Sequence, residues 1–433
     1  MASIKEPLII FERSLFTGNT DTNAKVSLTS TITNELLNCI PRAMSVTQSI
    51  GMLSPLVIVT FNDINGDLFN HLKPDMADVF TLKFIRSDSN QVEMKLKIIN
   101  VEYTGTVVGA TSNIEFRVTF MGESWYEMTA AINNRGWNDT LFSDVVKDVV
   151  SVGKFRETKI HATSNKAKSI IQPHNTNLDF LKWIKLQSFS NTVDGHYAFG
   201  VNYDNQFFFK NIAQHIIDYR PRMRNDEVIT FKLMAPEDNT NDAIQSKINN
   251  NQVPAYFVGV SGQTDYSDTV RSKASGGSVG YVDFTTGAYK TKAVSIGELD
   301  APMLSDKASL HAMHAKNKNF CFYGTDVNYD KKEKTRLSEE SFNAMTLKIL
   351  TEGSPNISIF DLVYVDINNT NEQTSSIKNL IHSGYYIVKN AVTTFSFEET
   401  VSMTTGITLA RHGYNTNNID DFSDMVETKR GKI

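Results

Sequence analysis

Cysteine, long apolar runs and surplus basic residues are all scarce in this sequence, and each absence excludes a class of protein. Two of the 433 residues are cysteine, Cys39 and Cys321, and they stand far apart. Two distant thiols do not make a disulfide framework, so we expect inert thiols in a protein made in a reducing cytoplasm. No apolar run approaches the roughly 20 residues of a membrane-spanning helix, and the N terminus lacks a secretory-signal pattern. We therefore expect a soluble chain without a membrane partner.

The charges nearly balance, with 43 Lys and Arg residues against 48 Asp and Glu residues and a net charge of −5. A nucleic-acid-binding protein usually needs a strong basic surplus, so the composition does not indicate a permanent nucleic-acid partner. Hydrophobic residues make up 40% of the chain and aromatic residues 10%, which suffices for buried cores. The length predicts about two to four domains.

Sequence motifs of catalysis are also scarce. There is no Walker A pattern, no G-x-G-x-x-G and no H-E-x-x-H. Residues 276–280 read G-G-S-V-G and match the G-x-S-x-G pattern of a hydrolase nucleophile. That nucleophile needs a buried strand before it and a helix after it, but the residues before Ser278 are polar and those after it alternate like a strand. We interpret this stretch as a hairpin loop.

Other clusters fall short of a metal site or an acid–base pair. His311, His314 and Cys321 offer three soft ligands, but a structural zinc site takes four, and no fourth stands at a suitable spacing. The adjacent glutamates at 339–340 and 398–399 do not face each other on a helix or on a strand. We predict that the chain is not an enzyme and has no catalytic residue, cofactor or metal.

Strand patterns are what the sequence has in abundance, most clearly from Ser354 to Arg411. β-Branched and aromatic residues dominate there, and Gly, Asn and Ser interrupt them. Three segments stand out, at Leu362–Asp366, Ser383–Lys389 and Val401–Arg411, with no helix pattern between them. Such a series favours an antiparallel meander or a small barrel.

The strand pattern recurs near the N terminus and then gives way to helices. The predicted strands cover residues 52–61, 78–85, 92–103 and 113–120. Apolar spacings of three and four between residues 141 and 150 predict a helix with Asn138 or Asp139 as its N-cap. A second helix is expected to start at Asn177, again with that residue as the N-cap.

A hairpin is expected after these helices. Residues 197–201 and 206–210 read as its two strands, with a turn at Asp204 and Asn205. Alternation along the return strand places Phe207 and Phe209 on one face and Phe208 on the other. Packing of these rings in the core is the favoured interpretation, and a partner-docking patch formed by Phe207 and Phe209 is the alternative.

Two further segments complete the pattern. Residues 228–233 read as a strand, and a long polar stretch follows. Residues 336–350 read either as a helix capped by Ser338 that runs into a strand, or as a helix throughout.

The order of these pieces resembles the central hub protein of phage tail baseplates, a family of tube-to-spike adaptors that also occurs in contractile injection systems. The likeness extends from about residue 26 to 412 and is best in Leu362–Asp366, Ser383–Lys389 and Val401–Arg411. The resemblance implies a mainly β fold with α+β insertions, built from two similar small antiparallel β-barrels plus a small α/β domain. It also favours helix followed by strand at residues 336–350.

The domain division that the resemblance implies has five parts. They are a first barrel (1–122), a small α/β domain (123–225), a second barrel (226–235 with 341–412), an insertion (236–340) and a C-terminal tail (413–433).

The resemblance implies a structural virion protein. Three chains with two barrels each would form a pseudo-six-fold ring that joins a six-fold tail tube to a three-fold central spike and surrounds part of the DNA channel. The implied partners are other copies of the chain in a homotrimer, the tail tube protein, the central spike protein and, as a further candidate, the tape measure protein. DNA would only pass through. The implied location is the tail baseplate of a virion assembled in the host cytoplasm.

Two other functions stay open at this point: a tail-associated cell-wall hydrolase and a host-receptor-binding tail protein. The first needs a carboxylate or metal constellation, and the second usually shows repeats; neither feature is visible in the sequence. The polar tail after Arg411 is expected to dock on a neighbouring subunit or on the spike. Its apolar anchors would be Ile419, Phe422, Met425 and Val426.

Overall fold

The structure is a computed structural model of the 433-residue chain. It describes residues 9–13, 28–29, 36–37, 39–63, 80–86, 90–108, 111–225, 227–233, 252–262, 277–283, 286–294, 299, 304, 319–322, 328–343, 345–369, 377–378, 382–397 and 402–412.

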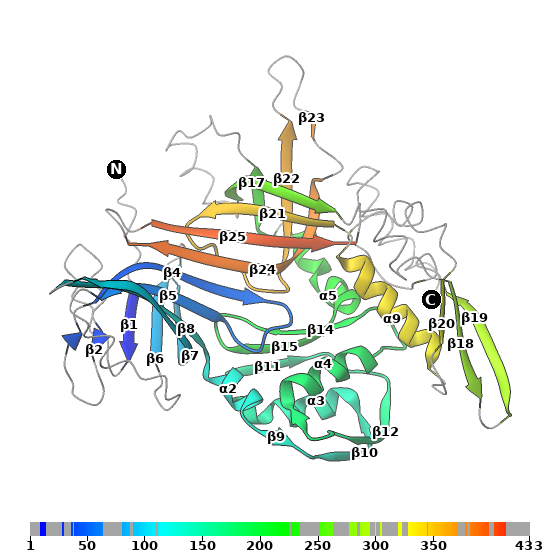
Figure 1. The fold of residues 1–433 in the computed structure, drawn as a ribbon. Coiled ribbons are helices and arrows are strands. Elements are labelled where there is room, and N and C mark those ends of the chain that lie inside the picture. Colours follow the sequence, from blue (N-terminus) through cyan, green and yellow to red (C-terminus); the bar gives the residue numbers. More distant parts are fainter. Residues whose placement is uncertain are drawn as a thin grey trace.

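Strands outnumber helices in these ranges (Figure 1). The strands of the first half are β1 (Ile9–Arg13), β2 (Leu28–Thr29), β3 (Leu36–Leu37), β4 (Cys39–Ser49), β5 (Leu56–Asp63), β6 (Phe80–Ile85), β7 (Gln91–Val108) and β8 (Thr111–Gly122). Those of the middle are β9 (Ile132–Asn133), β10 (Gly136–Leu141), β11 (Glu157–Ile160), β12 (Lys166–Ile171), β13 (Asn175–Thr176), β14 (Tyr197–Val201) and β15 (Gln206–Asn211).

The later strands are β16 (Thr230–Leu233), β17 (Gln252–Gly262), β18 (Gly277–Asp283), β19 (Ala288–Val294), β20 (Asn319–Phe322), β21 (Met345–Glu352), β22 (Leu362–Asn369), β23 (Ile377–Lys378), β24 (Gly384–Ser396) and β25 (Ser402–Arg411). The helices are α2 (Glu123–Thr129), α3 (Phe142–Val150), the 3-10 turn η1 (Ser151–Gly153), α4 (Asn177–Gln187), α5 (Ile212–Arg224) and α9 (Tyr329–Phe342).

One 13-stranded sheet runs through both halves of the chain, in the order β1-β6-β7-β8-β5-β4-β24-β25-β21-β17-β16-β22-β23. The two halves meet where β24 pairs antiparallel with β4, from Asn390 opposite Ser49 to Ser396 opposite Ala43. The same strand pairs with β25 on its other edge. β24 therefore belongs to both halves, although its residues and those of β4 lie more than 300 positions apart in the sequence.

The second half closes into a barrel. An additional pairing of β22 with β24 completes the ring β24-β25-β21-β17-β16-β22. Its interior holds a core cluster that includes Phe231, Leu347, Val363 and Tyr386. The ring is not purely antiparallel, because β16 runs parallel to both β17 and β22. The expectation of an antiparallel barrel is wrong at this point.

The first half shows the alternation expected of a half-buried strand. In β7, Val92, Met94 and Leu96 are buried in the core, whereas Glu93 and Lys95 are exposed. Among the described residues, no pairing joins β1 back to β4, so this half is an open sheet in those ranges. The closure of a first barrel, and its similarity to the second, stay predictions.

A small α/β part lies between the two halves in sequence and below the large sheet in Figure 1. The three-stranded sheet β11-β15-β14 pairs β15 parallel with β11 and antiparallel with β14. Helices α2, α3 and α4 contribute Met128, Val146 and Leu181 to a core cluster shared with that sheet. The sequence correctly predicts the hairpin at 197–210 and the apolar stripe of α3.

Several local predictions need correction. The residue that caps α4 is Thr176, whose hydroxyl accepts from Asp179 N, and not Asn177. The helix α3 starts directly after β10 without a side-chain cap, so neither Asn138 nor Asp139 caps it. The segment at 336–350 is helix followed by strand, as expected, but α9 begins at Tyr329, well before Ser338.

The boundary of the insertion also needs correction. β17 falls inside residues 236–340, yet it pairs with β16 and β21 and forms a wall of the barrel. β17 joins the sheet although polar sequence flanks it, because its backbone groups form hydrogen bonds with the strands on both sides. The mainly β fold with α+β parts is confirmed. The other domain boundaries stay predictions.

Candidate functional site

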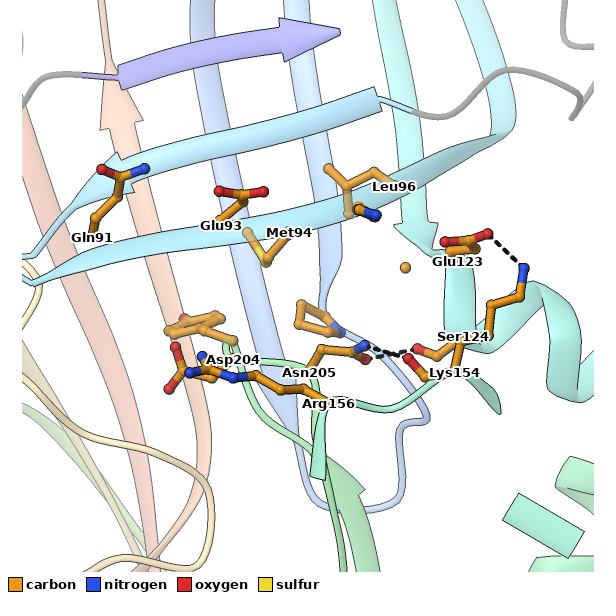
Figure 2. Close-up of a pocket in the computed structure, with 14 residues that line it drawn as sticks. Gln91, Glu93, Met94, Leu96, Glu123, Ser124, Lys154, Arg156, Asp204 and Asn205 are labelled. Carbon is orange, nitrogen blue, oxygen red and sulfur yellow. Dashed lines mark hydrogen bonds and ion pairs between the residues drawn. The ribbon is translucent and has the colours of Figure 1, made fainter. Parts of the chain in front are cut away.

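A polar cleft lies where the first half of the large sheet meets the small α/β part. Its volume is about 530 Å³. Figure 2 shows β7 along one side and a group that includes Arg156, Asp204 and Asn205 along the other. The lining residues come from five segments, namely the residue before β5, β7, the β8–α2 junction, the loop after η1 and the β14–β15 turn: Pro55, Gln91, Glu93, Met94, Lys95, Leu96, Gly122, Glu123, Ser124, Lys154, Arg156, Tyr203, Asp204 and Asn205.

The end of the cleft beside α2 depends on a close backbone approach at Gly122. Its N–H donates to Ser54 Oγ at 2.9 Å. A Cβ at this position would lie 2.8 Å from Ser54 Cβ, closer than real Cβ contacts, so a side chain would force the two segments apart. Ser124, the second residue of α2, donates a hydrogen bond from its hydroxyl to Asn205 Oδ1 at 3.1 Å. Gly122 therefore lets α2 turn back toward the β14–β15 turn.

The opposite wall is a tight turn that asparagines hold. Asn202 Oδ1 accepts from Asp204 N at 3.1 Å and from Gln206 N at 3.0 Å. Asn205 adopts a φ of 55°, a left-handed conformation that asparagine tolerates. Its Nδ2 donates to Lys154 O at 3.1 Å, which fixes the loop after η1 against the turn. These contacts set the position of the side chains of Asp204 and Arg156.

The charges of the cleft are unevenly paired. Glu123 lies 2.9 Å from Lys154 Nζ, Glu93 lies 3.9 Å from Lys83, and Asp204 lies 3.8 Å from Arg86. The hydrogen bonds that Glu123 and Glu127 accept raise the pKa of Lys154.

The other two cations of the cleft, Lys95 and Arg156, are both exposed. Within the described ranges, neither side chain has a hydrogen-bond or ion-pair partner. Each carboxylate that lines the cleft thus has a cationic partner, whereas Lys95 and Arg156 have no carboxylate partner among the described residues.

Tyr203 lines the cleft, and its ring belongs to the core cluster of the large sheet. Its hydroxyl donates toward Val46 O at 3.1 Å and Ala391 O at 3.2 Å, which belong to the two strands of the β4–β24 seam. Its ring packs edge-on to Phe84. Burial raises the pKa of Tyr203 to about 12, so the hydroxyl stays protonated and acts as a donor. The small α/β part is therefore anchored in the seam between the two halves.

Arg86 links three parts of the chain at the same junction. Its Nη1 donates to Asn356 Oδ1 at 2.7 Å, which belongs to the loop before β22. Its Nη2 lies 3.8 Å from Asp204, and its guanidinium stands 5.5 Å from the centre of the Tyr203 ring. Because Arg86 is buried with 6% of its surface exposed, these contacts are shielded from solvent.

A second buried contact joins the small α/β part to the barrel. Tyr219 donates to Asp361 Oδ1 at 2.8 Å, and His215 Nε2 lies 2.6 Å from Phe360 O. Lys210 lies 4.7 Å above the ring of Phe208, and burial lowers its pKa to about 8. Burial also raises the pKa of Asp361. Desolvated polar groups of this kind fix one relative orientation of the two parts.

The arrangement is suited to binding and to rigid assembly. No group of three or more His, Cys, Asp or Glu side chains in the described ranges is placed to hold a metal ion. The cleft combines paired charges, two uncommitted cations and backbone amides, which are groups that recognise a polar chain segment. That the chain is not an enzyme stays a prediction. None of the described helices is both long and apolar enough to cross a bilayer.

The alternative of a docking patch formed by Phe207 and Phe209 does not fit the structure. Both side chains are 0% exposed and belong to the core of the small α/β part. Phe208, on the other face of the strand, packs with Ile359 and Phe360 toward the barrel. The core interpretation is correct, because β15 is the middle strand of its sheet and both of its faces are covered.

The remaining sequence candidates separate into two groups. Ile419, Phe422, Met425 and Val426, together with His311, His314 and the glutamates at 398–399, lie outside the described residues. Ser278 lies within strand β18, which pairs with β19 and β20, so it occupies neither a strand-to-helix turn nor the predicted loop. The described glutamates of α9 form ion pairs, Glu339 with Lys185 and Glu340 with Arg336.

No local pattern in the sequence predicts the cleft, because its residues come from five separate segments. One local clue existed: Asn202, Asp204 and Asn205 surround Tyr203 in a turn, and asparagine and aspartate favour such turns.

No protein-family model matches the chain, and no curated protein sequence matches it. Solved structures do resemble it. A tail protein from Neisseria meningitidis MC58 matches with a TM-score of 0.51 and 9% identity, over 94% of this chain and 96% of that one. The 43 kDa tail protein of prophage MuSo2 from Shewanella oneidensis matches with a TM-score of 0.51 and 8% identity, over 93% and 98%. At such low identity the likeness concerns the fold, which this chain shares over nearly its whole length.

Proposed function

We propose that this chain is a structural tail protein: a homotrimeric hub that joins a six-fold tail tube to a three-fold central spike and surrounds part of the DNA channel. The observation that carries the proposal is the match of fold to two tail proteins over more than nine-tenths of each chain. A shared fold is an analogy for function, so the proposal also needs support from the architecture of the chain itself.

The architecture fits a rigid adaptor. A closed barrel continues through β24 into a second β half, and Tyr203 and Arg86 join both to the small α/β part. Two β units per chain give six units in a trimer, which is how a three-fold assembly meets a six-fold ring. A hub must also transmit load without its parts shifting, and the buried polar contacts at the junction oppose such shifts.

The proposed partners are the tail tube protein on one face, the central spike protein on the other and the tape measure protein. The proposed location is the tail baseplate of a virion assembled in the host cytoplasm. Obligate contacts between copies should bury on the order of 2,000 Å² or more. We infer no enzymatic step.

Light scattering on the purified protein, alone and mixed with its spike, tests the assembly. We expect the mass of a trimer alone, and a larger particle of defined stoichiometry with the spike. A stable monomer in both samples contradicts the proposal. So does a map of the particle that shows six or twelve copies at the hub, or that places the chain on a peripheral fibre.

A further inference from the structure

The cleft contains an open strand edge in addition to its two unmatched cations. Residues 91–96 of β7 pair with β6 on one side, from Gln91 opposite Ile85 to Leu96 opposite Phe80. On the other side, the pairing with β8 begins only at Leu96, opposite Gly122, because β8 ends there and α2 begins. No other described strand pairs with that edge at residues 91–95. Backbone groups of this edge therefore face the cleft without a strand partner.

These features favour one kind of occupant. An exposed strand edge binds an extended chain segment through main-chain hydrogen bonds. The unmatched Lys95 and Arg156 favour carboxylates on that segment, because the carboxylates of the cleft already have cations. A volume of about 530 Å³ also accommodates a few large side chains. The cleft is thus complementary to an extended, acidic segment with apolar residues.

The C-terminal tail of the chain has this composition. Between residues 419 and 427 it reads I-D-D-F-S-D-M-V-E, with four carboxylates interleaved with four apolar residues. We propose that this acidic segment of one copy binds in the cleft of a neighbouring copy. The proposal rests on the assembly of several copies proposed above and names a contact that would hold them together.

The position where the tail begins favours the cleft of another copy. His412 is buried against Phe342 of α9, with 5.5 Å between ring centres, so the end of β25 is fixed there. Figure 1 shows β25 ending beside α9, whereas α2, whose first residues line the cleft, lies on the far side of strands β14 and β15. The seven residues from Gly413 to Ile419 span at most about 25 Å, at about 3.6 Å per residue. The tail of one copy can therefore reach the cleft of a neighbouring copy that lies at this end of the barrel, without wrapping around its own chain.

Cross-linking between full-length chains tests the proposal. One chain carries Gln91→Cys, at the exposed edge of the cleft, and a second carries Asp424→Cys. The two are mixed, allowed to exchange and treated with a short bismaleimide. We expect a two-chain product whose cross-linked peptide contains both introduced cysteines. The parent chain, which has Cys39 and Cys321, gives the background.

Charge reversal supplies the control for specificity. Lys95→Glu with Arg156→Glu, added to the Gln91→Cys chain, should remove most of the cross-linked product. Lys182→Glu with Lys348→Glu reverses two exposed lysines outside the cleft, on α4 and β21, and this matched change should leave the yield unchanged.

Three outcomes would overturn the proposal. The first is that no cross-linked product exceeds the background of the parent chain. The second is that a chain carrying both introduced cysteines cross-links only within itself, and the third is that both charge variants give an equal yield of the two-chain product. Light scattering on the same samples separates this failure from that of the assembly. A trimer without the cross-link rejects the tail contact alone, whereas a monomer rejects the assembly as well.

Discussion

At the scale of single residues, Tyr203 connects parts of the chain that are distant in sequence. It stands in a turn of the small α/β part, yet its ring belongs to the core of the first half, together with Phe84 and Phe395. Its hydroxyl contacts carbonyls on both sides of the β4–β24 seam. A phenol is well suited to this place because it combines a large apolar ring with one donor.

Removing only that hydroxyl should therefore destabilise the protein. For Tyr203→Phe we expect a loss of about 1 kcal/mol in the free energy of unfolding, because a buried donor and its hydrogen bonds disappear while the ring remains. Urea unfolding followed by circular dichroism measures the loss. Tyr103→Phe is the matched control, since Tyr103 is 62% exposed. Equal midpoints for the two variants would show that the contact at the seam contributes nothing.

Two buried histidines predict sensitivity to acid. Burial lowers the pKa of His196 and of His412 to about 3, and Lys185 near His196 acts in the same direction. Both rings pack on Phe342, at 5.2 Å and 5.5 Å, and His196 also contacts Ser338 Oγ. A folded-state pKa below the ordinary value of 6.5 means that the unfolded chain takes up the protons first. The contribution of these two histidines to the free energy of unfolding is therefore constant above pH 6.5 and is lost as the pH falls from there toward 3.

At pH 4.5 we expect each of these histidines to cost about 2–3 kcal/mol of stability relative to pH 8. Thermal unfolding from pH 8 to pH 4.5 measures the effect. His412→Gln should flatten the pH dependence, whereas His174→Asn, at an exposed histidine, should not. If the two variants share the slope of the parent protein, other groups cause the loss.

At the scale of elements, β24 is the strand on which both halves depend. Between residues 390 and 396 it pairs with β4 on one edge and with β25 on the other. A central strand in this position has backbone hydrogen bonds on both sides, so it tolerates changes of exposed side chains but not the loss of an N–H.

Proline at an exposed position of β24 tests this dependence. Thr394 lies opposite Ser45 of β4 and Thr404 of β25, and its side chain is exposed. We expect Thr394→Pro to destabilise the fold by about 3 kcal/mol or more and Thr394→Ala to change it little. Differential scanning fluorimetry gives the comparison. Similar melting temperatures for both variants would argue against a shared central strand.

At the scale of the whole molecule, the two halves of the large sheet should unfold together. They share β24, and Tyr203 and Arg86 connect the small α/β part to both. Parts joined by a continuous sheet and by buried polar contacts lose these contacts as soon as one of them unfolds.

Two core substitutions, one in each half, examine this coupling. Val57→Ala in β5 and Leu347→Ala in β21 each remove apolar volume at a side chain that is 0% exposed. The leucine change should cost about 2–5 kcal/mol and the valine change less. In calorimetry we expect one heat-absorption peak for the parent chain, and both variants should move the whole peak. If a variant shifts only part of the heat absorption to a lower temperature and leaves a second peak at the temperature of the parent chain, the two halves unfold independently.

Local periodicity in the amino-acid sequence correctly predicts several elements of the fold. Alternation along residues 92–98, the hairpin around Asp204 and the three–four spacing of α3 all predict their elements, because the side-chain period follows directly from the backbone geometry. The same alternation correctly divided Phe207 and Phe209 from Phe208. It did not show that both faces of β15 are covered, which is why a docking patch stayed open as an alternative.

The pairing of segments that are distant in sequence is seen only in the folded chain. β24 with β4, β17 with β16 and β21, and Tyr203 in the seam each join residues with no local signature of their partner. Strand pairing depends on backbone hydrogen bonds, which any residue except proline supplies, so the sequence of one strand does not name its neighbour. The cleft arises in the same way, because five segments without a shared sequence pattern come together in the fold. Only this arrangement shows which of its charged side chains have an ion-pair partner.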